Sequence, residues 1–153
     1  MKLMLKLLFL SILLSICFIA SGFAEETSIT GKWKTIDDKT NEPKSIVKIY
    51  EKDGKYFGQI EKLFRKPGED PDPVCDKCAD KDPRKDQPVK GMEIIKDLVK
   101  KGDKYSDGTI LDPKNGKVYN CKLWIDKDDN LMVRGYIAFF FRTQTWYKAE
   151  NQE

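Results

Sequence analysis

Two dipeptides, Asp53-Gly54 and Asn115-Gly116, constrain the fold of this chain more than any other sequence feature. Each separates two runs rich in β-branched and aromatic residues, and Asp-Gly and Asn-Gly are the pairs that tight β-hairpin turns prefer. The flanking runs are residues 45–51 and 56–60 for the first turn, and 109–111 and 118–125 for the second. The chain is therefore predicted to consist of antiparallel hairpins.

Further strand signals raise the number of strands to about eight, the number at which a sheet closes into a barrel that fills with side chains or holds one small ligand. Closure also removes unpaired sheet edges. The additional strands are expected at Gly31–Asp37, near Met92–Leu98, at 131–137 and at about 142–148. The segment 93–101 fits a short helix equally well, because its apolar residues also share one helical face. The fold class is thus all-β, with a small antiparallel barrel as the expected architecture.

The N-terminus has the order of a secretion signal. Lys2 and Lys6 precede an uncharged apolar run, Leu7–Ala20, which is shorter than the roughly 20 residues of a membrane span. Gly22-Phe23-Ala24 provides small residues for cleavage after Ala24. We therefore interpret residues 1–24 as a signal peptide and residues 25–153 as a single barrel domain. Lipid attachment at Cys17 is the less favoured alternative, because the bulky Ile16 precedes it.

Charge and composition exclude several classes of function. The formal charge of +3 falls to +1 when Lys2 and Lys6 are removed, and lysines and acids are interspersed, so no nucleic-acid partner is expected. The lysines at 96, 100, 101 and 104 are interpreted as a solvated face rather than a contact for anionic lipid. Without histidine, the chain lacks the base of most nucleophilic triads and the usual ligand of catalytic zinc. No catalytic residue, metal site or cofactor is predicted.

Cys75 and Cys78 form a C-x-x-C motif inside a long, proline-rich segment, 67–88. Loops of this length are usually functional or held in place. Export favours a structural disulfide within the loop, or one from the loop to Cys121. A thiol redox site and a metal site completed by Asp76 remain as alternatives. Because Cys121 alternates with apolar residues on a predicted strand, we interpret it as a buried free thiol.

The predicted barrel interior is mainly apolar. On each strand the inward face is taken as the alternating set richer in apolar residues. Gly58 and Gly135 fall on these faces, where a missing side chain either leaves room for a ligand or permits the sharp curvature of a filled barrel. The residues proposed to line a ligand site are Val47, Ile49, Tyr56, Ile60, Leu123, Ile137 and Phe139.

Several segments together resemble one exported bacterial family, the domain-of-unknown-function family numbered twenty-one forty-seven. They are Gly31-x-Trp33, Ser45–Tyr50, Val74-Cys75-x-x-Cys78, Gly91–Ile94, Ile110–Tyr119, Val133–Ile137 and Arg142–Trp146. The resemblance implies a lipocalin-like barrel and supplies no catalytic residues. In that picture Gly31 allows close backbone approach, Trp33 plugs the closed end, and Arg142, or failing it Arg134, lies across the indole.

These observations favour an exported protein, periplasmic or secreted, that binds a small apolar or amphipathic molecule and is not an enzyme. The alternative is a structural or protein-interaction domain of the envelope with a filled core. A thiol–disulfide redox protein is the third reading, and it requires an accessible cysteine of low pKa.

Cleavage after Ala24 is the first testable prediction, because a basic segment, an apolar run and small residues occur there in the order of a signal peptide. N-terminal sequencing of the protein recovered from the producing cell should begin at Glu25. Recovery of intact Met1, or of a lipid on Cys17, would contradict the assignment.

Overall fold

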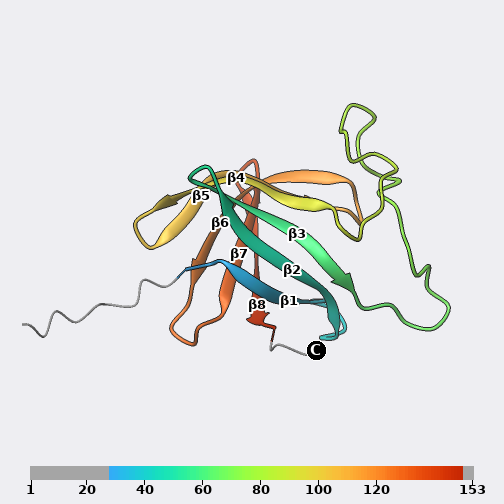
Figure 1. Cartoon of the computed structure of the whole chain (residues 1–153), viewed down its shortest axis with the longest axis horizontal. Helices are drawn as coiled ribbons and strands as arrows, with labels where there is room; N and C mark the ends of the chain where they lie inside the picture. Colours follow the sequence, from blue (N-terminus) through green and yellow to red (C-terminus); the bar gives the residue numbers. More distant parts are fainter. Residues whose placement is uncertain (1–27, 150–153) are drawn as a thin grey trace, which may run out of the picture.

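In the computed structural model, which describes residues 28–149, the chain forms eight antiparallel strands closed into one barrel (Figure 1). The strands are β1 (Gly31–Ile36), β2 (Pro43–Lys52), β3 (Lys55–Leu63), β4 (Glu93–Lys101), β5 (Lys104–Asp112), β6 (Lys117–Ile125), β7 (Leu131–Ile137) and β8 (Phe140–Lys148). Each strand pairs with its neighbours in sequence, and β1 pairs with β8. The predicted antiparallel barrel of about eight strands is confirmed. The predicted signal peptide and Cys17 lie outside the described residues.

Because successive strands alternate in direction, their connections divide between two ends of the barrel. The entry end, where the chain enters β1, carries the turns at 53–54, 102–103 and 126–130. The loop end carries the turn at 37–42, the long loop 64–92, and the turns at 113–116 and 138–139. The long loop stands out from the barrel on the right of Figure 1.

The predicted hairpin turns are present. Asp53 and Gly54 both have positive φ, 53° and 73°, as a two-residue turn of the tight mirror-image type requires. Gly116 also has positive φ, and its N–H donates to the carbonyl of Asp112 over 2.8 Å. In the turn after β6, the side chain of Asp126 accepts hydrogen bonds from the N–H groups of Asp128 and Asn130. These bonds lower the pKa of the Asp126 carboxyl.

The segment that fitted either a helix or a strand is a strand, β4. Ile95 and Leu98 are both completely buried and face β3, opposite Gly58 and Tyr56, although residues three apart on a regular strand point to opposite faces. Asp97, with a φ of 59°, forms a bulge that restores the inward direction at Leu98. The spacing that imitated a helix therefore comes from an irregular strand.

A second bulge lies beside the first. On β5, Asp107 has a φ of 65°, and Tyr105 and Gly108 pair with Leu123 and Cys121 on β6 across a register shift. A Cβ at Gly108 would lie 2.3 Å from the backbone oxygen of Lys96. The two bulged strands therefore approach so closely that only glycine fits at this position.

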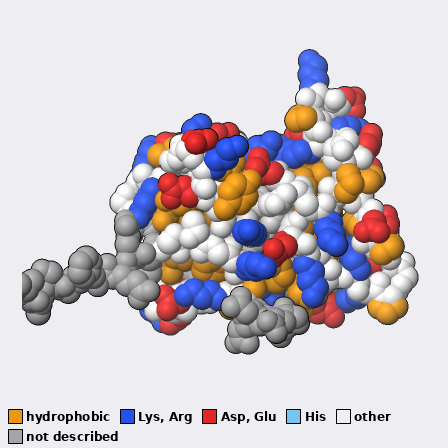
Figure 2. Space-filling view, in the orientation of Figure 1, with side chains coloured by type: hydrophobic (Ala, Val, Ile, Leu, Met, Phe, Trp, Pro, Cys, Tyr) orange, Lys and Arg blue, Asp and Glu red, His pale blue; other side chains and the backbone are white. Residues whose placement is uncertain are grey.

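The entry half of the barrel is filled by side chains. Trp33 is almost completely buried, and its Nε1–H donates to the carbonyl of Ile29 over 2.8 Å. Tyr56 and Tyr105 meet edge to face with ring centroids 4.7 Å apart. Of the two interpretations of Gly58, the filled barrel holds, because Cδ1 of Ile95 lies 2.9 Å from where a Cβ would stand and no room is left for a ligand. The outer surface carries interspersed charges, as Figure 2 shows for one face.

Two inward glycines allow a matched test of this packing. We expect Gly108→Ala to destabilise the protein by about 1–3 kcal/mol or more, because the new methyl group meets backbone atoms that cannot rotate away. Gly135→Ala is the control, since its Cβ would make an ordinary 3.5 Å contact with Cβ of Tyr119 and should change stability little. The measurement is urea unfolding of both variants; equal midpoints would contradict the close approach of β4 and β5.

Candidate functional site

The barrel becomes progressively more exposed toward its loop end. Along the inward row of β7, Leu131 and Val133 are buried, Gly135 is partly buried and Ile137 is 50% exposed. On β8, the inward row passes from buried Trp146 through half-buried Gln144 to Arg142 at 66% exposure of its side chain. The inner wall of β7 and β8 is thus sealed at the entry end and opens at the loop end.

The residues predicted to line a ligand site are divided by this gradient. Five of them lie in the buried core: Val47, Ile49, Tyr56, Ile60 and Leu123. Ile137 and Phe139 lie at the rim of the loop end, with Phe139 86% exposed. Between the two groups lies Gly135, where a Cβ would meet only Tyr119 and Ile110 at 3.5–4.0 Å.

A polar contact spans the rim between β1 and β8. Asp38, just beyond β1, pairs with the guanidinium of Arg142 and accepts a hydrogen bond of 3.1 Å from Gln144. The expected stacking of Arg142 on Trp33 is therefore wrong. Trp33 is opposite Lys148, six positions along β8 from Arg142, or roughly 20 Å of extended strand.

Arg134 does not replace Arg142 at Trp33 either. It lies on the outer face of β7, where its guanidinium is 5.1 Å from the ring of Trp124 and 4.5 Å from the ring of Phe141. Its Nε–H donates to Oγ1 of Thr143 over 2.7 Å. Alternation identifies this face, because Arg134 neighbours the inward residue Val133.

The long loop 64–92 is held by covalent and backbone contacts. Cys75 and Cys78 form the disulfide favoured from the sequence, and both residues are buried, at 0% and 3% exposure. Val74 forms an isolated bridge with Pro88, and Cys75 N–H donates to Gln87 O over 2.9 Å. The loop therefore has its own small fold, and the sulfur atoms lie inside it.

The same loop packs against the turn between β5 and β6. A Cβ at Gly116 would lie 1.7 Å from the carbonyl oxygen of Lys77, so glycine is needed for this approach.

A second contact joins the long loop to β4. The side chain of Arg84 binds Asp82 through two nitrogens and donates to the carbonyl of Glu93 on β4. The Arg84 guanidinium lowers the pKa of Asp82 to about 2. The stability from this pair is complete above the carboxyl's unfolded pKa of about 4 and is lost as pH falls toward 2.

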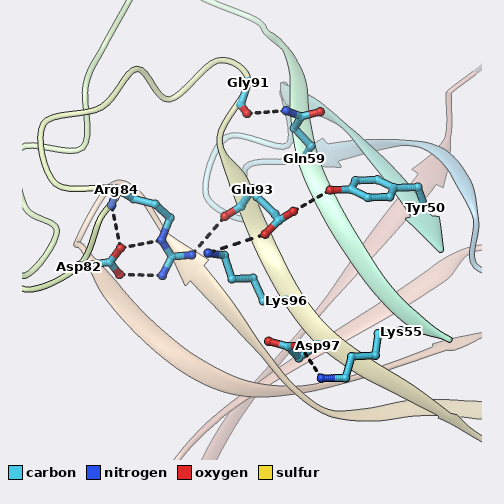
Figure 3. Close-up of polar contacts among 9 residues, drawn as sticks. All are labelled: Tyr50, Lys55, Gln59, Asp82, Arg84, Gly91, Glu93, Lys96 and Asp97. Atoms are coloured by element: carbon cyan, nitrogen blue, oxygen red, sulfur yellow. Dashed lines mark hydrogen bonds and ion pairs between the residues drawn. The ribbon is translucent and has the colours of Figure 1, made fainter. Parts of the chain in front are cut away.

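A shallow polar groove of about 420 Å³ crosses the outer face of β2, β3 and β4. In it the hydroxyl of Tyr50 donates to Oε2 of Glu93 over 2.6 Å, and Lys55 pairs with Asp97 at 2.8 Å (Figure 3). Burial and the nearby carboxylate raise the pKa of Tyr50 to about 12. A tyrosine with this pKa stays protonated near neutral pH and donates a hydrogen bond rather than acting as a base. The two contacts in the groove therefore join β2 and β3 to β4.

The remaining cysteine of the described chain, Cys121, is free and buried on the inner face of β6. Burial raises the pKa of its thiol to about 12, which leaves it protonated and unreactive at neutral pH. Among residues 28–149, no three cysteine or carboxylate side chains gather as a metal-binding group. None of these residues forms a helix long and apolar enough to span a membrane.

Comparison with known proteins agrees with this architecture. Residues 31–148 match the family model described as "Uncharacterized protein conserved in bacteria (DUF2147)". A solved structure, "Protein HP1028 from the human pathogen Helicobacter pylori belongs to the lipocalin family", is 18% identical, with a TM-score of 0.67 over 82% of this chain and 85% of the other. This likeness concerns the fold alone. No curated protein matches the chain.

The cysteine arrangement predicts a distinctive labelling pattern. In the chain from Glu25 onward, which lacks Cys17, a thiol reagent without reductant should modify none of the three cysteines of the folded protein, since two are bonded and one is buried. Unfolding in urea should expose one thiol, and reduction should then expose two more. Cys75→Ser should cost only about 1–2 kcal/mol, because the bond closes a very short loop. A reactive Cys121 in the folded state would contradict the packing of β6.

Proposed function

The chain belongs to the bacterial family DUF2147, and from this membership and the open loop end we propose that it binds a small apolar or amphipathic molecule inside the barrel. The observation that carries the proposal is the rise in exposure along the inward residues of β7 and β8, which are buried at the entry end and exposed at the loop end. The lipocalin-like neighbour supports the use of such a barrel for ligands.

The inner face of the barrel near the loop end suits the apolar part of such a molecule. Gly135 has no side chain, so the inner face of β7 leaves space beside the half-buried side chains of Tyr119 and Ile110. Ile137 and Phe139, together with the polar group of Asp38, Arg142 and Gln144, flank the opening. An elongated ligand would place its apolar part toward Gly135 and its polar end at the rim.

The interior also has an unused polar group. The hydroxyl of Tyr105 is buried without a hydrogen-bond partner in the described part of the chain. Buried polar groups are nearly always satisfied by protein, water or ligand atoms. Because Tyr105 lies in the packed entry half, this hydroxyl belongs to the filled part of the interior and is no part of the open loop end.

We place the protein outside the cytoplasm, in the periplasm or secreted, since an intramolecular disulfide persists in oxidising compartments. A binding role is preferred over a redox enzyme, because the sulfur atoms of Cys75 and Cys78 are buried and a redox site needs access. A protein-interaction domain with a filled core is the alternative, favoured by the dense packing around Trp33 and Tyr105.

Binding of a fluorescent long-chain fatty acid tests the proposal. Wild-type protein should bind it, and Gly135→Leu should weaken binding about tenfold or more, because the added side chain extends toward Tyr119 and Ile110. Asn120→Leu is the matched control, since it adds the same side chain at an exposed outer position of β6. No binding by the wild type would favour the interaction domain, and equal binding by wild type and Gly135→Leu would place the site elsewhere.

A further inference from the structure

The hairpin between β7 and β8 carries an apolar tip that the barrel does not use. Residues 135–141, Gly-Tyr-Ile-Ala-Phe-Phe-Phe, contain no charged side chain. The large side chains at the tip are exposed: Ile137 by 50%, Phe139 by 86%, Phe140 by 66% and Phe141 by 61%. Single exposed apolar residues are ordinary, whereas a contiguous cluster of this kind marks a contact surface.

The architecture limits what can cover this tip. On β7 the backbone is paired with β6 as far as Tyr136 and with β8 as far as Ile137. β8 pairs with β1 only at Tyr147 and Lys148, so the apolar character of the tip comes from its side chains and not from a closed sheet edge. Ala138 and Phe139 form a narrow turn between the two strands. A protruding turn with adjacent phenyl rings, whose centroids for Phe139 and Phe140 are 4.8 Å apart, suits a fluid apolar phase that needs no matching groove.

The side chains next to the tip change from apolar to aromatic and basic with distance from the turn. Arg134 and Arg142 are each four residues from Ala138, or about 13 Å along an extended strand. Arg134 lies against Trp124 and Phe141, so aromatic rings and a guanidinium share this level. Apolar faces of interfacial proteins sink about 5–10 Å into the boundary between head groups and acyl chains. Aromatic and arginine side chains concentrate at the head groups themselves.

We propose that the β7–β8 hairpin inserts Ile137, Phe139 and Phe140 into the surface of a phospholipid bilayer, with Arg134 at the level of the lipid phosphates and Arg142 held at the rim by Asp38. The contact sets the loop end of the barrel against the membrane. The biological purpose of this contact rests on the proposed function, because the apolar ligand would enter the barrel directly from the lipid phase. Docking itself requires no ligand.

Flotation with vesicles tests the contact. The chain from Glu25 to Glu153, which contains the whole barrel and lacks the predicted signal peptide, is mixed with vesicles of phosphatidylethanolamine and phosphatidylglycerol. Wild type should float with the vesicles, and the double variant Phe139→Ser, Phe140→Ser should lose about tenfold or more of its partition coefficient. Tyr147→Ser is the control, since it removes an exposed aromatic residue from β8 far from the tip, and it should float like wild type.

The depth of insertion provides a second readout. Tryptophan introduced by Phe139→Trp should be quenched by lipids brominated in the acyl chain, whereas tryptophan introduced by Tyr147→Trp should not. Failure of the wild type to float would overturn the proposal. So would equal flotation of wild type and the double variant, or self-association through the tip, detected by sedimentation, in place of vesicle binding.

Fatty-acid binding in vesicle-free buffer separates this proposal from the proposed function. Because Phe139 also flanks the proposed ligand opening, this comparison uses the single variant Phe140→Ser, which changes an exposed residue outside the proposed site. A Phe140→Ser variant that keeps fatty-acid affinity but floats less than wild type would support membrane docking as a distinct property of the tip. A wild type that floats but binds no fatty acid would leave the docking intact and would overturn the ligand-binding function.

Discussion

Closure of the sheet between β1 and β8 is the constraint on which the rest of this structure depends. The seam is short: backbone pairing joins Trp33 to Lys148 and Lys34 to Tyr147. The N–H of Ala149 adds a bond of 2.9 Å to the carbonyl of Lys32 at the entry end. Toward the loop end, beyond the last backbone pair, the side chain of Asp38 contacts Arg142 and Gln144 instead. The buried entry end and the exposed loop end thus correspond to the paired and unpaired parts of the seam.

Much of the fold could be predicted because hairpin turns and strand alternation are local properties. Asp53-Gly54 forms its turn from its own backbone preferences, and Val47 and Ile49 alternate regularly on β2. The bulges could not be predicted from the sequence, because the positive φ of Asp97 and Asp107 has no local signal such as a glycine at either position. As a result, Ile95 and Leu98 carried a helix-like spacing within a strand.

The candidate site was harder to predict than the fold, because its residues depend on register across the barrel. Ile137 lies on the same inward row as Val133, yet the row leaves the core between them. Alternation gives the direction of a side chain and cannot give its depth. Similarly, Arg142 is near Trp33 in a sequence-based picture of the family, but the offset between β1 and β8 sends it to Asp38. Gly116 indicates in the sequence that some backbone segment could approach it closely. Nothing in the neighbouring residues identifies Lys77 as that segment.

The burial of Cys121 has a consequence for how the protein matures. Residues 25–153 contain three cysteines, so oxidation could join them in three different pairs. Cys75 and Cys78 are close in sequence and can meet before the barrel forms, whereas either pairing with Cys121 requires distant segments to collide. Once β6 is in place, the third thiol is shielded and protonated. The short sequence separation of Cys75 and Cys78, and the later burial of Cys121, therefore direct oxidation to the Cys75–Cys78 disulfide alone. An odd number of cysteines then leaves no reactive thiol on the folded domain.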